Sequence, residues 1–257
     1  MFRKILFILF SFCGILLAQN KIGQFDFENN IIDPYGNLTT REWYNGTAEN
    51  IITYVNGHNG LAGRSSHNND DGGNDFGVML PGTFPSSGEL YIRWWVKYDS
   101  NYWGDCGGIW NVKWLWSEGG NHNELIFQYY SNGNIGIDWQ VTQGASWSPG
   151  DELNSGSFPY TFGNWMKIEI YFKLSSGSNH YNYDGIQWLK VNDNYIIHDE
   201  SVSTGVPGQI YCPALKASCD CASSRGWWQI DDYEAWDGIP NSDPPPSQVQ
   251  GIQVTAN

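Results

Sequence analysis

Positive charge is scarce in this 257-residue sequence. It contains 13 Lys and Arg against 27 Asp and Glu, which gives a formal net charge of −14 at pH 7. Nucleic acids and anionic membrane surfaces bind basic surfaces, so both are excluded as main partners. Only 16% of the residues are charged, but another 16% are aromatic. This aromatic content predicts a packed globular protein rather than a disordered chain.

Helical periodicity is also lacking, and so are nucleotide-binding signatures. No stretch of helical length has an apolar stripe with a 3.6-residue period, and no phosphate loop, nucleophile elbow or dinucleotide fingerprint is present. Instead, segments such as "GELYIRWWVKYDS" (88–100) and "GNWMKIEIYFKLSSG" (163–177) alternate with period two between Gly, Asn and Ser. The pattern predicts an all-β fold, a two-sheet antiparallel β-sandwich, with a hairpin turn at "VNDNY" (191–195).

The first residues have the layout of a targeting segment. Two cations precede an apolar run that is too short to span a bilayer comfortably, and a small residue, Ala18, follows it. We therefore predict a signal peptide over residues 1–18, and a secreted protein that is extracellular, periplasmic or on the cell surface, with no membrane contact after cleavage. The alternative is a lipoprotein anchor at Cys13, but the preceding Phe12 disfavours it.

The remaining four cysteines form an even set, which in an exported protein indicates disulfides. Cys219 and Cys221 are too close in sequence to pair comfortably with each other. We therefore expect Cys106 and Cys212 each to bond to one of them. A metal cluster in "CPALKASCDC" is the alternative, although no histidine lies inside that segment.

The domain organisation follows from composition. Residues 20–240 can form a single large β domain, interrupted by long polar segments at 56–75 and 143–163 that we interpret as loops. We predict that residues 241–257 form a Pro-rich linker and the truncated start of a following module. The stretch "PPPSQVQGIQVT" resembles the first strand of a fibronectin type III module, so we expect further modules of a longer chain as partners.

Several segments together resemble a known superfamily. "FDFEN", "ELYIRWWVKYD", "GNWMKIEIYFKL" and "QIDDYEAWDG" follow the order of concanavalin A-like jelly rolls, and most resemble heparin lyase I-like and alginate lyase-like domains. The resemblance implies that the first and last of these segments pair. It also implies a concave sheet carrying Arg93, Lys97, Gln128 and Tyr130, although the Gln-x-His element of alginate lyases is absent because position 130 is Tyr.

Period-two alternation within the central segments predicts which residues share a face. If the segments at 91–98, 109–116, 124–130 and 135–140 are neighbours, one surface collects aromatic, amide and charged groups suited to a sugar chain. The predicted binding residues are Trp95, Lys97, Asn111, Asp138 and Gln140. The predicted catalytic residues, should the domain be an enzyme, are Arg93, Lys113, Gln128, Tyr130 and His122.

We predict a carbohydrate-binding domain for a polysaccharide or oligosaccharide, with an acidic glycan favoured by the cations of this face. The sequence leaves open whether the domain is an enzyme. The alternatives are a polysaccharide lyase acting on uronates by β-elimination, a glycoside hydrolase and an adhesive surface protein. No cofactor is required and no metal ligand is assigned. A structural calcium ion near Glu28, Asp231 and Glu234 is an alternative.

Overall fold

The computed structural model describes residues 19–28, 39–43, 52–66, 75–80, 84–100, 110–118, 122–129, 133–142, 152–205, 209–211, 216–217 and 227–241. The predicted signal peptide, all five cysteines and residues 242–257 lie outside these ranges. The predictions made for them therefore stay predictions.

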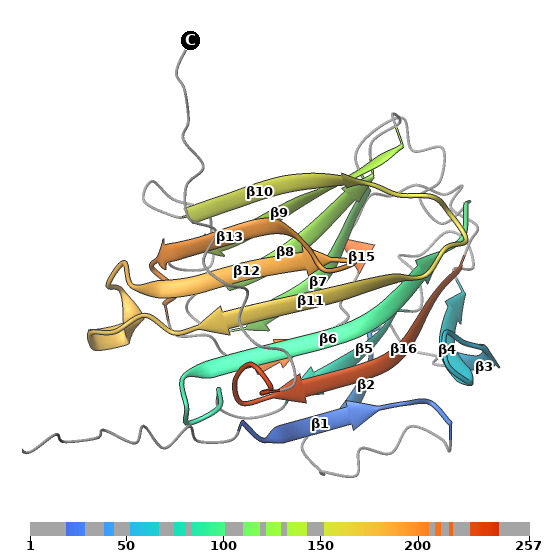
Figure 1. The fold of residues 1–257 in the computed structure, drawn as a ribbon, viewed down its shortest axis with the longest axis horizontal. Helices are drawn as coiled ribbons and strands as arrows, with labels where there is room; N and C mark the ends of the chain where they lie inside the picture. The colour runs from blue at the N-terminus through green and yellow to red at the C-terminus, as the bar shows by residue number, and fades with distance from the viewer. Residues whose placement is uncertain are drawn as a thin grey trace, which may run out of the picture.

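The described residues form two antiparallel sheets that pack face to face, so the predicted all-β sandwich is confirmed (Figure 1). We call the first the front sheet. Its order is β13 (Asn194–Val202), β12 (Gly185–Val191), β11 (Met166–Lys173), β6 (Glu89–Tyr98), β16 (Trp227–Trp236), β4 (Leu61–Ser66) and β3 (Ile52–Asn56), with β1 (Lys21–Phe25) also paired to β16.

The second sheet, which we call the back sheet, is seen behind the first in Figure 1. Its order is β10 (Glu152–Pro159), β9 (Asn134–Thr142), β8 (His122–Tyr129), β7 (Trp110–Glu118), β14 (Gln209–Tyr211), β5 (Asp75–Leu80) and β2 (Thr39–Trp43), with β15 (Lys216–Ala217) paired to β7. The helical content of the described residues is one 3-10 turn, η1 (Ser178–His180). No helix among them is long and apolar enough to cross a membrane.

The core lies between the two sheets and includes alternate residues of strands such as β6, β9 and β11. On β6, Ile92, Trp94 and Val96 are buried, and Trp94 is 0% exposed. From the back sheet, Phe127 and Trp139 enter the same core cluster. Burial of such large side chains stabilises the sandwich by about 2–3 kcal/mol each.

Two predicted local features are confirmed. The first and last segments pair, because β1 runs antiparallel to β16 and sets Phe25 opposite Tyr233. The turn between β12 and β13 has positive φ at Asn192 (48°) and Asp193 (68°), as a tight hairpin turn requires.

A second aromatic cluster lies on the side of the front sheet that faces away from the core, which we call the outer face. Tyr91, Tyr171 and Trp188 occupy adjoining register positions on β6, β11 and β12, and all three are buried. Trp236 and Ile239 pack against this cluster. This part of the outer face is therefore covered by the protein itself.

Candidate functional site: the outer face of the front sheet

The outer face carries the residues of β6 that the alternation set apart. Since Ile92, Trp94 and Val96 point into the core, Arg93, Trp95 and Lys97 emerge together on the opposite side. All three are half-buried. The prediction that they share one face is confirmed.

The prediction that this face continues through the next three strands is wrong. β6 is hydrogen-bonded to β11 and β16, whereas β7, β8 and β9 belong to the back sheet. Asp138 and Gln140 alternate with the core residues Ile137 and Trp139 and so face away from the core on the back sheet. They lie on the opposite side of the sandwich from Trp95, because the chain crosses between sheets after β6.

Four other predicted residues belong to the back sheet. They are Asn111 and Lys113 on β7, and His122 and Gln128 on β8. The register pairs Asn111 with Gln128 and places Lys113 two residues further along β7, while His122 is the first residue of β8. Tyr130 and the side chains of these four lie outside the described residues. Because β6 belongs to the front sheet, Arg93 does not share a strand face with the four back-sheet residues.

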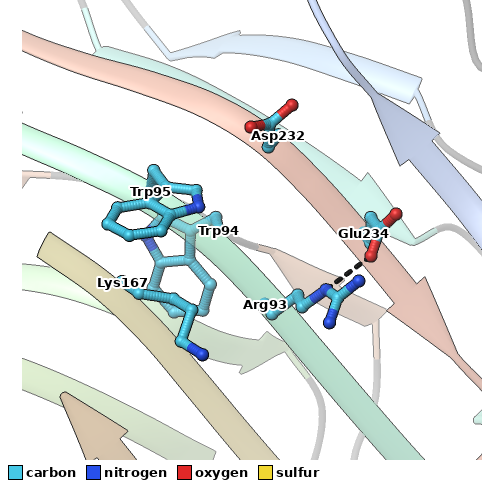
Figure 2. A pocket seen from close by; sticks show the side chains of 6 residues that line it. All are labelled: Arg93, Trp94, Trp95, Lys167, Asp232 and Glu234. Atoms are coloured by element: carbon cyan, nitrogen blue, oxygen red, sulfur yellow. Dashed lines mark hydrogen bonds and ion pairs between the residues drawn. The ribbon is translucent and has the colours of Figure 1, made fainter. Parts of the chain in front are cut away.

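A pocket of about 200 Å³ opens on the outer face where β6, β11 and β16 adjoin. Figure 2 shows Arg93 reaching from β6 towards Glu234 of β16, with Lys167 of β11 near Trp95. The residues that line the pocket are Arg93, Trp94, Trp95, Lys167, Asp232 and Glu234. The outward-facing indole of Trp95 thus meets two cations and two carboxylates in a small open site, while Trp94 belongs to the core beneath it.

A β-bulge in β16 brings both acidic side chains to this pocket. The register with β6 shifts between Asp231 and Glu234, and Asp232 has φ of +48°. A bulge re-aims the side chains beside it. Asp232 and Glu234 consequently line the same pocket, while Asp231 is fully buried.

Glu234 is held by two cations. Arg93 Nε donates to its Oε2 at 2.5 Å, and Lys21 Nζ donates to Oε1. Burial alone would raise the pKa of Glu234, but Lys21 and Arg93 outweigh burial and lower it. Glu234 is therefore an ionised acceptor at neutral pH, and it fixes the position of the Arg93 guanidinium.

Lys167 is held in a similar way on the other side of Trp95. Its Nζ lies 3.2 Å from Glu169 Oε2 and 2.5 Å from Asp193 Oδ1. Burial would lower the pKa of Lys167, but the hydrogen bond to Asp193 and the charge of Glu169 raise it. Tyr91 donates to Glu169 Oε1 at 2.6 Å, so this buried carboxylate has partners on both oxygens.

The turn between β3 and β4 supplies an aromatic partner for Trp95. The His58 imidazole stacks on the Trp95 indole, with 3.7 Å between ring centroids and 13° between planes. Its Nδ1 lies 3.6 Å from Asp232 Oδ2. Burial and the neighbouring Glu234 and Asp26 raise the pKa of Asp232, and His58 offsets part of that rise.

The buried Asp231 side chain holds the turn between β3 and β4 in place. Its Oδ2 accepts from the backbone N–H groups of His58 at 2.8 Å and Asn59 at 3.0 Å, and its Oδ1 accepts from Asp232 N–H at 2.8 Å. Burial nevertheless raises the pKa of Asp231 to about 6. The carboxylate therefore acts as the anchor that holds His58 over Trp95.

The sequence reading missed several residues of this site. His58, Lys167 and Asp232 are not among the residues that the sequence pattern predicts. Asp231 and Glu234 enter the sequence-based predictions only as neighbours of a structural calcium ion, whereas they belong to β16, which lies between β6 and β4 in the front sheet. Among the described residues no group of three or more His, Cys, Asp or Glu is placed to hold a metal ion. The calcium alternative stays a prediction.

The fold defines the class of protein as a jelly-roll β-sandwich. No family model matches the chain, and no curated protein matches it. Several solved structures, by contrast, share its fold. The binding domain of Paraclostridial mosquitocidal protein 1 has a TM-score of 0.54 at 14% identity, over 86% of this chain and 50% of that one.

Two further structures share the fold. An alginate lyase from Chlorella virus has a TM-score of 0.53 at 11% identity, over 72% of this chain and 88% of the lyase. Botulinum neurotoxin type C, whose cell entry depends on interaction with two ganglioside molecules, has a TM-score of 0.53 at 11% identity, over 86% and 48%. The chain spans about half the length of the toxin chains it matches. At these identities the likeness shows the fold, and it confirms the jelly-roll prediction.

Proposed function

We propose that this chain is a secreted carbohydrate-binding domain that recognises a polysaccharide, an acidic one by preference, on the outer face of its front sheet. The observation that carries the proposal is the Trp95 pocket. An indole that faces away from the core is held against His58 and is bordered by ionised hydrogen-bonding groups. Sugar rings have apolar C–H faces that pack on aromatic rings and hydroxyls that bond to such groups.

The pocket is preorganised for this role. Arg93 is fixed by Glu234 and Lys167 by Asp193, so little side-chain freedom is lost when a ligand binds. The volume of the pocket, about 200 Å³, is below the ~300–1,000 Å³ of sites that enclose a whole small molecule. The pocket therefore suits one sugar unit of a longer chain. The solved structures that share this fold include an alginate lyase and a neurotoxin whose cell entry depends on gangliosides. This likeness supports the proposal of a saccharide ligand.

Affinity electrophoresis through gels containing a panel of polysaccharides tests the proposal. The Trp95→Ala variant should lose retardation, with affinity reduced about tenfold, because one aromatic contact contributes roughly 1–1.5 kcal/mol. Tyr183→Ala is the matched control, since Tyr183 is a 64% exposed aromatic residue that does not line the pocket. Retardation that survives Trp95→Ala unchanged would refute this location.

The lyase alternative is favoured by a separate observation on the back sheet. The register sets Asn111 beside Gln128, with Lys113 two residues along β7. Residues of these types can stabilise the charge of a uronate carboxylate, which β-elimination requires. An increase in ultraviolet absorbance from unsaturated uronate on incubation with polyuronates, lost in Gln128→Ala and kept in Trp95→Ala, would favour a lyase. No increase with any polyuronate or glycosaminoglycan would remove it.

A further inference from the structure

Two cations lie in one row across the outer face, next to the Trp95 pocket. The register pairs Gln229 of β16 with Lys97 of β6 on one side and with Arg64 of β4 on the other. Neighbouring strands are about 4.8 Å apart, so the backbones of the two cationic residues are separated by roughly 10 Å. Long Lys and Arg side chains can both reach a ligand group placed between them.

Each cation is held against an indole. The Arg64 guanidinium carbon lies 4.3 Å from the ring centroid of Trp227. Lys97 Nζ lies 4.6 Å from the Trp165 centroid and 5.6 Å from that of Trp227. Such contacts are favourable, but a neutral ring does not cancel the charge of the cation.

Neither cation has a carboxylate at ion-pair distance in the described part of the chain, unlike Lys21, Arg93 and Lys167. Arg64 Nε is buried and has no hydrogen-bond partner, and Gln229, which is 1% exposed, has an unpartnered side-chain oxygen. Burial lowers the pKa of Lys97, and the charge of Arg64 lowers it further. Two neighbouring cations with no carboxylate partner among the described residues are an unfavourable arrangement when no ligand is bound.

The row formed by Arg64 and Lys97 is continuous with the Trp95 pocket. The His58 ring that stacks on Trp95 also meets the edge of Trp165, at 6.1 Å between centroids. Lys97 is two residues from Trp95 on the same face of β6. A glycan that places one ring at Trp95 would therefore bring the substituents of an adjacent unit to the two cations.

We infer that Arg64 and Lys97 form a subsite for an anionic group of the glycan, a carboxylate or a sulfate. The inference rests on the proposed function and sharpens it, since it assigns the preference for acidic glycans to this row rather than to Arg93, whose charge is already neutralised by Glu234. An anion here would receive charge-assisted hydrogen bonds and relieve the repulsion between the cations.

The first test uses inorganic sulfate and does not depend on glycan binding. Sodium sulfate should raise the melting temperature of the wild-type protein more than sodium chloride of equal ionic strength does, by mass action on the folded state. The Arg64→Gln/Lys97→Gln double variant should lose this excess. The matched control is Lys190→Gln, because Lys190 also lies over two rings, at 4.8 and 4.9 Å, but is paired in register with Glu169. It should keep the excess.

The second test compares glycans. A polyuronate, a sulfated glycosaminoglycan and a neutral polysaccharide are run with the wild type, the double variant and Trp95→Ala. The double variant should bind the acidic glycans at least about tenfold more weakly, because the loss of even one charged hydrogen bond has that effect, and it should bind the neutral glycan unchanged. The acidic glycan whose affinity falls most between the wild type and the double variant identifies the bound group as a carboxylate or a sulfate.

The two proposals fail in distinguishable ways. Equal affinities of wild type and double variant for acidic glycans, with Trp95→Ala still defective, would overturn the anion subsite and leave the glycan pocket standing. A sulfate-specific stabilisation that the double variant loses, in a protein that binds no glycan, would overturn the glycan pocket and leave an anion site. A sulfate effect that Lys190→Gln loses equally would overturn the assignment to Arg64 and Lys97.

Discussion

Replacement of Asp231 by Asn should change the pH dependence of folding stability in a direction that the structure fixes. The carboxyl group is 0% exposed, and burial raises its pKa from 3.8 to about 6. The folded protein therefore binds this proton more tightly than the unfolded chain does. The contribution of Asp231 to stability is fully present below pH 3.8 and is lost as the pH rises through 6.

The magnitude follows from those two pKa values. Between pH 4.5 and pH 7.5 the wild-type protein should lose about 2 kcal/mol of unfolding free energy through Asp231. Asp231→Asn should lose none through this position. Its constant cost is on the order of 1–3 kcal/mol, because one of the three backbone N–H donors would face the amide NH₂ group instead of an oxygen.

The assay is urea denaturation of both proteins at the two pH values, followed by far-ultraviolet circular dichroism. The difference in unfolding free energy between wild type and variant should be larger at pH 4.5 than at pH 7.5, by about 2 kcal/mol. A difference that does not change with pH, or that is larger at pH 7.5, would refute the assignment of the raised pKa to Asp231. Equal m-values in the two proteins show that the comparison is valid.

Two more substitutions test the scaffold of the pocket. Glu234→Gln should cost about 2 kcal/mol at neutral pH, because it removes the negative charge and one of the two oxygens that accept from Arg93 and Lys21. Since the pKa of Glu234 is lowered, this cost should shrink as the pH falls below 4.5, measured by denaturation at pH 7 and pH 3.5. A cost that grows on acidification would contradict this. Gly57→Ala should destabilise the protein by about 1–3 kcal/mol, because its Cβ would lie 2.9 Å from the backbone N of Ala62 and would also meet the Asp231 carboxylate; an unchanged melting temperature would show that the turn accommodates it.

Much of the fold could be predicted from local patterns. The alternation in "YIRWWVK" correctly separated the core residue Trp94 from the outward-facing Trp95, because strand side chains alternate whatever the strand pairs with. The Asn192–Asp193 turn was also local, since these residue types adopt positive φ at low cost. The pairing of β1 with β16 was implied by the superfamily resemblance and not by the residues alone.

The site could be predicted only in part, because alternation assigns a residue to a face of its strand but not a strand to a sheet. Trp95 and Asp138 both alternate with core residues, yet they emerge on opposite sides of the sandwich. His58 reaches Trp95 through a turn anchored by Asp231, which is 173 residues away in sequence. No local pattern encodes such a contact, and the anion subsite needs the same tertiary pairing to bring Arg64 next to Lys97.

Hydrogen–deuterium exchange, with and without a polysaccharide that binds, tests the central claim most directly. If the glycan lies on the outer face of the front sheet, peptides covering residues 56–66, which include the His58 turn and β4, should gain protection on binding, and those covering β8 and β9 should not. Protection confined to β8 and β9, with residues 56–66 exchanging as in the free protein, would contradict the account and place the glycan on the back sheet.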